Sequence, residues 1–542
     1  MTLSASLAGA AWISANLSGY WRYRAALFTP AETQWALLRR YLHANARTAF
    51  GRAHGFAGIR SIDEYQDRVP LASYSDLSPW IDDISRGRQQ VLTRARVRSL
   101  GLSSGSVSAA KRIPYTRRLQ QEFRRAIAPW VADLYRSRPR LALGSSYWSI
   151  TPVTRDPLRA QDAIPVGFDE DSEYVGAVWK GLVDATLAVP GAVRFIRDME
   201  SFRYVTLLFL LRRRDLSLIS VWHPTFLTLL FEAMAPRWDM LIDDVRRGTI
   251  RAPSSLPADL ERVLDSFLRP DPGRAQELDA LGPRDYTAIW PHLRLVSCWA
   301  EGHATLHVHE LKRMLPNVHV QPKGLLATEA VVTLPFRGLT PLAIRSHFFE
   351  FLRDGRPLLS HQILPGDVYS VVVTTGGGLY RYRLEDRVQV NGFVDKTPSL
   401  TFLGKEDHVS DLCGEKLNEA FVGGELRTAW TQLGLFPRFA LVAPDLSQSP
   451  ARYTLYLEMD AEPPLELGRF VDERLACNPH YRYCRTLGQL APLRLFRASS
   501  PMFRLYVERC RELGQRVGDT KPLALSTYAG WSAVFPGRYQ GE

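Results

Sequence analysis

Helical and extended sequence patterns alternate along the chain. Residues 31–50, AETQWALLRRYLHANARTAF, space their apolar side chains at three and four, which predicts a helix packed on a core. Residues 216–234 predict a strand that turns at Pro224 into an apolar helix, and residues 293–300 and 368–375 predict further strands. This alternation is typical of an α/β fold.

The length and one charged segment divide the chain. With 542 residues it is too long for one domain of ordinary size, and its 46% hydrophobic content is enough for large cores. A strand pattern ends in the charged segment 400–411, LTFLGKEDHVSD, and beyond it a strand at 452–459 and a helix at 467–476 predict an α+β unit. We therefore predict a large domain over residues 1–403 and a smaller one over residues 404–542.

Three features of the sequence bear on its cellular setting. The first 21 residues carry no charge, but they lack a basic n-region, and Ser and Asn interrupt the apolar run, so they predict a packed helix rather than an export signal. No run of about 18 to 20 apolar residues predicts a membrane span. The five cysteines form no CxxC pair, which argues against a zinc site or a disulfide framework and favours the cytoplasm.

The net charge is +12, with 60 arginines and only eight lysines. Basic residues are spread along the chain without a recognition-helix motif, so we expect no nucleic-acid partner and interpret the charge as an arginine bias that also attracts anionic substrates. Lysines kept in such a chain suggest chemistry that needs a compact ammonium. Of the eight, Lys111, Lys405, Lys416 and Lys521 are the ones we single out, because they fall in segments that look most like motifs.

The first motif is GLSSGSVSAAKRIPYT, residues 101–116. We expect it between a strand at 97–102 and a helix capped by Thr116. Serine and glycine let backbone N–H groups approach a phosphate, and Lys111 can neutralise its charge, although the chain has no Walker-type GxxxxGK[ST] loop. The alternative is an ordinary solvent-facing loop.

Two further motifs carry carboxylates. PKGLLATEAVV at 322–332 places Thr328 and Glu329 between two apolar runs, where the hydroxyl can bond a phosphate oxygen and the carboxylate can hold a magnesium ion. A helix cap or an exposed loop is the alternative there. GLYRYRLEDRV at 378–388 ends a strand with Asp386, which can accept hydrogen bonds from ribose hydroxyls or, alternatively, pair with the neighbouring arginines.

Together and in this order, the motifs resemble those of adenylate-forming enzymes. More closely, the chain resembles the acyl acid amido synthetases of the Gretchen Hagen family, which conjugate plant hormones such as auxin and jasmonate, and especially their bacterial relatives. The resemblance runs almost end to end. It is carried by NARTAFGRAHGF (45–56), VPLASYSDLSPWI (69–81), SSGSVSAAKRIPYT (103–116), RSHFFEF (345–351), GLYRYRLEDRV (378–388), CNPHYRYCRTLGQL (477–490) and GQRVGDTKP (514–522).

The resemblance implies a fold and a reaction. The fold would be a large luciferase-like α/β domain followed by a smaller, mobile α+β domain, with the hinge near Lys405 to Asp407. A small carboxylic acid would attack the α-phosphate of ATP, giving acyl-AMP and pyrophosphate. An amine, typically that of an amino acid, would then displace AMP to form an amide. ATP and Mg²⁺ are the implied cofactors.

The resemblance also implies roles for individual residues. The phosphates would be bound by Ser103, Ser104, Gly105, Ser106 and Thr328, and the ribose by Asp386. Glu329 would hold magnesium, and it would take part in catalysis together with Lys416 and Lys521 from the smaller domain. Trp222, His223 and Phe226 lie in the region that lines the acyl site in the family. A packed core with one satisfied histidine is the alternative for them.

Four positions depart from the pattern of the family: Val107 where a second hydroxyl residue is common, Ala330 and Glu385 where glycine is usual, and Lys405 where arginine is expected. They leave open altered kinetics, an unusual substrate or a degenerate enzyme. We predict an active amide-forming ligase that acts on small molecules, with no nucleic-acid or membrane partner. The alternatives are an acyl-CoA ligase, which hands the acyl group to a thiol, and a nucleotide-binding scaffold without catalysis.

Overall fold

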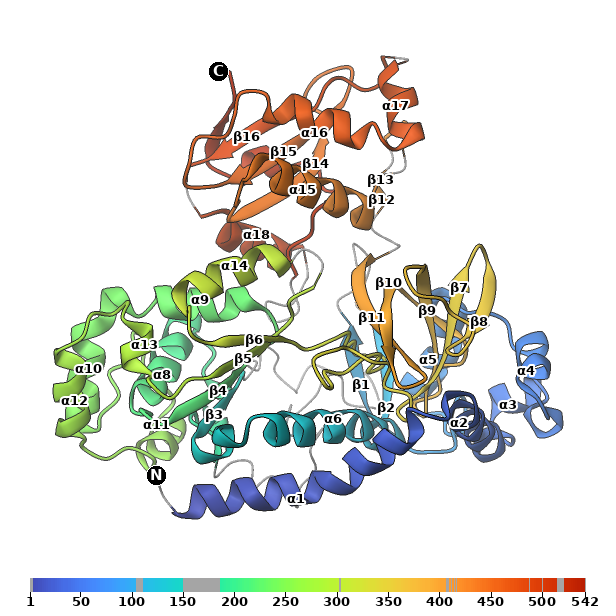
Figure 1. Ribbon diagram of the computed structural model, residues 1–542, viewed down its shortest axis with the longest axis horizontal. Helices are drawn as coiled ribbons and strands as arrows, with labels where there is room; N and C mark the ends of the chain where they lie inside the picture. Colours follow the sequence, from blue (N-terminus) through green and yellow to red (C-terminus); the bar gives the residue numbers. More distant parts are fainter. Residues whose placement is uncertain are drawn as a thin grey trace.

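The chain forms three parts, which are called here the antiparallel lobe (centred on residues 348–405), the parallel lobe (145–322) and the C-terminal unit (409–541) (Figure 1). The long helices α1 (Leu3–Ala26) and α6 (Arg117–Ser137) lie side by side along the two lobes. The computed structural model describes residues 3–103, 111–149, 186–301, 304–405, 409–410, 412–413, 415, 417–486, 488–499, 501–513 and 521–541.

The antiparallel lobe is built on a five-stranded sheet of order β11-β10-β9-β7-β8. Its strands are β7 (Phe348–Arg353), β8 (Arg356–Leu359), β9 (Val368–Thr374), β10 (Tyr382–Val394) and β11 (Thr397–Lys405). Its helices are α2 (Pro30–Asn45), α3 (Ala49–Ala53), α4 (Ile62–Arg68) and α5 (Tyr74–Ser85), with a 3₁₀ turn at Phe56–Gly58. Apolar side chains of helices and strands share one core. The strand predicted at 368–375 is confirmed as β9.

The helix predicted over residues 31–50 is two helices in the structure. Helix α2 ends at Asn45, whose buried side-chain oxygen accepts a hydrogen bond from the Arg94 N–H at 3.0 Å. Thr48 then caps α3, because its hydroxyl oxygen accepts a hydrogen bond from the Gly51 N–H at 3.0 Å. The apolar spacing continues across this break, which is why the sequence pattern alone does not reveal it.

The small-residue loop connects two strands rather than a strand and a helix. Strands β1 (Val97–Ser103) and β2 (Lys111–Thr116) pair antiparallel, with Ser103 opposite Lys111. Helix α6 follows directly, and Thr116 caps it by accepting the Leu119 N–H at 3.1 Å, as predicted. The expectation missed β2 because its six residues are few and include Pro114, which removes a ladder donor.

The parallel lobe contains a sheet in sequence order, β3-β4-β5-β6. Its strands are β3 (Ser145–Trp148), β4 (Leu216–Ser220), β5 (Leu295–Cys298) and β6 (His319–Pro322). Its helices are α8 (Met199–Leu211), α9 (Pro224–Glu232), α10 (Trp238–Arg247), α11 (Ala258–Asp265), α12 (Pro272–Asp279), α13 (Tyr286–Ile289) and α14 (Thr305–Met314), with 3₁₀ turns at Pro139–Leu143, Gly191–Phe195 and Ala235–Arg237. The predicted turn from strand to helix at Pro224 is confirmed, since Pro224 begins α9. All four strands end at one edge, the usual place for a ligand in an α/β sheet.

The C-terminal unit contains a mixed sheet of order β14-β15-β16-β17 and has its own apolar cores. Its strands are β12 (Val409–Ser410), β13 (Leu417–Asn418), β14 (Phe439–Asp445), β15 (Arg452–Glu458), β16 (Arg494–Ala498) and β17 (Gly537–Tyr539). Its helices are α15 (Glu419–Leu433), α16 (Leu467–Leu475), α17 (Pro479–Thr486) and α18 (Met502–Glu512), with a 3₁₀ turn at Trp531–Ala533. In Figure 1 this unit lies above α9 and α14.

The predicted N-terminal helix is present as α1, which packs through the buried Tyr20 and Tyr23. Within the described residues, none of the helices is long and apolar enough to cross a bilayer. All five cysteines are free.

Two of the cysteines, scattered in the sequence, come together in the C-terminal unit. Cys413, Glu415 and Cys484 place their polar atoms within 4.8 Å of one another. The Glu415 carboxylate accepts hydrogen bonds from the backbone N–H groups of Leu412 and Cys413, at 2.7 and 2.9 Å, and from the Tyr453 hydroxyl. The carboxylate therefore binds two backbone N–H groups of the chain that follows β12.

Candidate functional site

Asp386 lies in β10 and is buried, with 3% of its surface exposed. The preceding residue, Glu385, has a positive φ of 62°, a left-handed conformation that suits glycine. A residue with a Cβ in this conformation carries a backbone cost of ~1–2 kcal/mol. Lys111, the first residue of β2, pairs with Glu385 at 3.3 Å. Strand β2 is therefore tied to the strand that carries Asp386.

Thr328 and Glu329 occupy the tip of a tight turn. The Ala327 N–H donates to the Ala330 carbonyl at 2.9 Å, and a short antiparallel bridge closes the turn. Glu329 is only 6% exposed. The alternatives of a helix cap and an exposed loop are therefore both wrong for this carboxylate.

Carboxylates of both motifs affect the pKa of one buried phenol, that of Tyr382. Tyr382 begins β10 and is buried, and burial raises its pKa above the ordinary value. The carboxylates of Glu329, Glu385 and Asp386 add to that rise because each disfavours a phenolate nearby. Glu329 and Asp386, which are far apart in the sequence, therefore both lie close enough to Tyr382 to disfavour its charged form.

The buried pair of His347 and Glu122 supports the turn that carries Thr328 and Glu329. The His347 ring accepts the Val331 N–H on Nε2 at 3.2 Å, so its proton lies on Nδ1, which donates to Glu122 at 3.1 Å. The same Glu122 oxygen accepts the N–H of Gly376 at 2.9 Å. A Cβ at Gly376 would lie 2.3 Å from Glu122, so only glycine lets the chain pass here. Because Glu122 and His347 are 225 residues apart, sequence reasoning missed this pair.

The C-terminal unit reaches the carboxyl edge of the parallel sheet through two side chains. Lys521 places its Nζ 3.7 Å from the centroid of the Trp299 ring. Phe503, in α18, stacks on His223 with ring centroids 6.2 Å apart and contacts His307 at 5.6 Å. Lys521 and the acyl-site candidate His223 therefore both lie at the contact between the C-terminal unit and the parallel lobe.

The acyl-site candidates have different surroundings. Trp222 is 40% exposed, whereas His223 is buried and accepts the Thr225 N–H at 3.3 Å, which caps α9. Phe226 packs against Phe202 in the core of the parallel lobe. Of the three, Trp222 presents the largest surface to a ligand, and the capping role of His223 was not predicted.

Several predicted residues lie outside the described part of the chain, namely Ser104, Gly105, Ser106, Val107 and Lys416. Ser103 is the last residue of β1. Lys405, where the resemblance implies a hinge, is the last residue of β11 and pairs with Asp386 in the β10–β11 ladder.

Sequence reasoning also missed Glu301, which follows the carboxyl end of β5. Its carboxylate accepts the Phe402 N–H of β11 at 2.9 Å, and burial raises its pKa to about 7. It therefore joins the parallel lobe to the strand that leads into the C-terminal unit. The only sequence signal was its position three residues after the segment LVSC, directly after a predicted strand.

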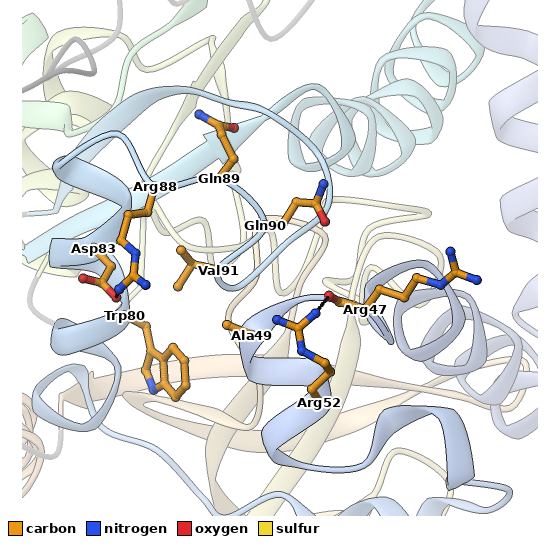
Figure 2. Close-up of a pocket in the computed structure, with 9 residues that line it drawn as sticks. All are labelled: Arg47, Ala49, Arg52, Trp80, Asp83, Arg88, Gln89, Gln90 and Val91. Atoms are coloured by element: carbon orange, nitrogen blue, oxygen red, sulfur yellow. Dashed lines mark hydrogen bonds and ion pairs between the residues drawn. The ribbon is translucent and has the colours of Figure 1, made fainter.

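A separate pocket of about 410 Å³ lies in the antiparallel lobe and is shown in Figure 2. It is lined by Arg47, Ala49, Arg52, Trp80, Asp83, Arg88, Gln89, Gln90 and Val91. The Arg52 guanidinium donates to the Arg47 carbonyl at 2.6 Å, and Arg88 pairs with Asp83 at 2.6 Å. None of the predicted site residues lines this pocket.

Solved structures define the class of fold. An acyl acid amido synthetase described as AtGH3.15, in complex with 2,4-DB, superposes with a TM-score of 0.85 at 20% identity, covering 98% of each chain. A 2-hydroxyisobutyryl-CoA ligase with bound R3-HIB-AMP superposes with a TM-score of 0.52 at 11% identity, covering 94% of this chain and 92% of that one. The chain therefore has the α/β fold of adenylate-forming enzymes, as predicted.

The family follows from the sequence comparison. The GH3 family N-terminal, central and C-terminal domains match residues 22–320, 340–405 and 427–528, so the chain belongs to the GH3 family. A probable indole-3-acetic acid-amido synthetase of Oryza sativa subsp. japonica is 25% identical, over 72% of this chain and 71% of its own. An indole-3-acetic acid-amido synthetase of Arabidopsis thaliana is 23% identical over 88% and 90%. A jasmonoyl–L-amino acid synthetase of Oryza sativa subsp. japonica is 22% identical over 80% and 81%.

Proposed function

We propose that this protein is an ATP-dependent acyl acid amido synthetase. It joins a small carboxylic acid to an amine, the amino group of an amino acid. The observation that carries the proposal is that the buried carboxylates Glu329 and Asp386 both lie near Tyr382, on a strand tied to β2 by the Lys111–Glu385 pair, in a chain of the GH3 family. The names of its amido synthetase relatives support the same activity.

The reaction has two bond exchanges. First, a carboxylate oxygen of the acid bonds to the α-phosphorus of ATP, and the bond from that phosphorus to the bridging oxygen breaks, which releases pyrophosphate. Second, the amine nitrogen bonds to the acyl carbon and loses a proton, while the bond between that carbon and the AMP oxygen breaks. The products are the amide and AMP.

Ser103, Ser104, Gly105 and Ser106, together with Thr328, would hold the phosphates. Asp386 would accept hydrogen bonds from the ribose. Glu329 would hold Mg²⁺, which supplies positive charge to the phosphate oxygens. A cation suits this position, because Glu329 is buried and, among the described residues, no basic side chain pairs with it.

We further propose that residues 1–403 form the ATP- and acyl-binding domain and residues 404–542 a mobile domain. Lys416 and Lys521 would reach the reacting groups from the mobile domain. Trp222, His223 and Phe226 would lie on the acyl side of the site. A cytoplasmic location, where ATP and amino acids are abundant, fits this activity.

The test is pyrophosphate release from the full chain with ATP, Mg²⁺ and a panel of carboxylic acids, followed by mass spectrometry of the product. We expect release with at least one acid and an amide product when amino acids are added. Product formation only with coenzyme A would favour the acyl-CoA ligase. No release with any acid would favour a nucleotide-binding scaffold.

A further inference from the structure

Lys323 lies at the carboxyl edge of the parallel sheet. It follows β6 directly, and its backbone N–H donates to the carbonyl of Cys298, the last residue of β5, at 3.0 Å. Its ammonium donates to the hydroxyl of Ser220, the last residue of β4, at 2.6 Å. Three neighbouring strands therefore fix the position of this side chain.

Three indole rings surround the same ammonium. The Lys323 Nζ lies 5.0 Å from the centroid of Trp130, 5.6 Å from that of Trp148 and 5.7 Å from that of Trp222. Trp130 is itself held by a hydrogen bond from its indole N–H to Gln321, at 3.0 Å. The rings come from α6, from the end of β3 and from the segment after β4, so the cage is assembled from distant parts of the chain.

The cage stabilises a cation but does not neutralise it. Cation–π contacts offset part of the cost of removing an ammonium from water. Within the described residues no carboxylate pairs with Lys323, and its hydrogen bond to Ser220 uses one of its three N–H donors. Burial accordingly lowers the pKa of Lys323 to about 8, with a small opposing effect of Cys298. The ammonium thus has donors and charge left for an anion.

One wall of the cage, formed by Trp222, is partly exposed to solvent. Trp222 is 40% exposed, and its carbonyl accepts the Trp299 N–H at 2.8 Å. Trp299 in turn carries the Lys521 ammonium on its ring. The exposed wall of the cage therefore continues into the contact with the C-terminal unit, on the same edge of the sheet as Glu301.

We propose that Lys323 binds the carboxylate of the acid substrate, with Trp222 as an apolar wall for the body of that acid. The proposal rests on the amido synthetase function proposed above. Among the anions of that reaction, the ATP phosphates are already assigned to residues 103–106, to Thr328 and to the Mg²⁺ that Glu329 would hold. Indole walls around a single ammonium suit a singly charged group on an apolar body better than a heavily hydrated polyphosphate.

One consequence separates this role from a general structural role. Adenylation converts the carboxylate into a neutral acyl group, so the attraction to Lys323 ends once acyl-AMP has formed. Loss of the ammonium should therefore weaken binding of the free acid and slow adenylation at low acid concentration. Aminolysis of preformed acyl-AMP should be unchanged.

The experiment is isothermal titration of the full chain, without ATP, using two pairs of probes: indole-3-acetate with indole-3-acetamide, and benzoate with benzamide. Each pair differs in charge but little in shape. The proteins are the wild type, Lys323→Met, Lys323→Arg and, as a matched control, Lys312→Met, in which an exposed lysine of α14 is neutralised.

In the wild type and in Lys312→Met, we expect at least one acid to bind tenfold or more tightly than its amide. In Lys323→Met the affinity for the acid should fall tenfold or more and equal the affinity for its amide. Lys323→Arg should keep part of the preference for acid over amide. Equal binding, or none, of acid and amide to the wild type would overturn the proposal, and this comparison needs no variant to fold. An acid preference that survives in folded Lys323→Met would overturn it as well.

A failure of the Lys323 subsite can be distinguished from a failure of the proposed synthetase function. Charge-dependent acid binding through Lys323 without pyrophosphate release would support this subsite and contradict the synthetase. Pyrophosphate release with an unchanged KM for the acid in Lys323→Met would support the synthetase and contradict this subsite.

Discussion

The ammonium of Lys521 lies 3.7 Å from the centroid of the Trp299 ring, so a residue of the C-terminal unit rests on the carboxyl edge of the parallel sheet. Trp299 follows β5 directly, and its N–H donates to Trp222. A lysine held in this way is positioned beside the proposed acyl site in the conformation described here. A movement of the C-terminal unit would remove it.

We predict that Lys521→Ala slows acyl-AMP formation about tenfold or more, because a cation that stabilises charge developing on the α-phosphate is lost. Aminolysis of preformed acyl-AMP should fall less, and Lys416→Ala should show the reverse order. Single-turnover assays of each half-reaction measure both effects. Equal losses in both steps would argue against a division of labour between the two lysines.

Asp386→Ala should raise the KM for ATP about tenfold or more, since charge-assisted hydrogen bonds to the ribose are lost. Steady-state kinetics with varied ATP give this value, and the melting temperature without ATP serves as the control. An unchanged KM with a lower melting temperature would make Asp386 a structural ion-pair residue instead.

Glu329→Gln should abolish magnesium-dependent adenylation while leaving the fold intact. The amide keeps the size of the side chain but not the charge that binds a divalent cation, and loss of such a ligand costs several kcal/mol of transition-state stabilisation. The rate of acyl-AMP formation is measured over a range of Mg²⁺ concentrations. Acyl-AMP formation within threefold of the wild type would contradict the magnesium role.

Glu122→Ala should destabilise the fold by about 3 kcal/mol, because it leaves the buried donors of His347 and Gly376 without their acceptor. Glu32→Ala, at an exposed site in the first turn of α2, is the matched control and should have little effect. Thermal unfolding of both variants provides the comparison. Similar melting temperatures would mean that Glu122 does not hold the Thr-Glu turn.

Glu301 should make stability depend on pH. Burial raises its folded-state pKa to about 7, above the usual 4.5, so the folded state binds more protons than the unfolded state between these values. Its contribution to stability is greatest below about pH 4.5 and is lost as the pH rises to about 7. Glu301→Gln should therefore gain melting temperature relative to the wild type between pH 5 and pH 8. A constant difference across this range would contradict the assignment.

Local patterns predicted the elements well, and long-range contacts explain what they missed. The cap at Thr116 and the helix start at Pro224 follow from neighbouring residues, so they could be read directly. The pair Glu122–His347 and the cage around Lys323 require segments that only the folded chain brings together. Lys323 was given no role from the sequence, because nothing in its own segment indicated three tryptophans around it.

The pairing of Asp386 with Lys405 in the β10–β11 ladder has a consequence for chimeric proteins. Side chains alternate between the faces of a strand, so inserting or deleting one residue in this hairpin would turn Asp386 to the opposite face. An exchange of C-terminal units between relatives should therefore join the chains after Lys405, where the ladder is already complete. A crossover within residues 387–404 that changed the length of this hairpin would misplace the Asp386 carboxylate.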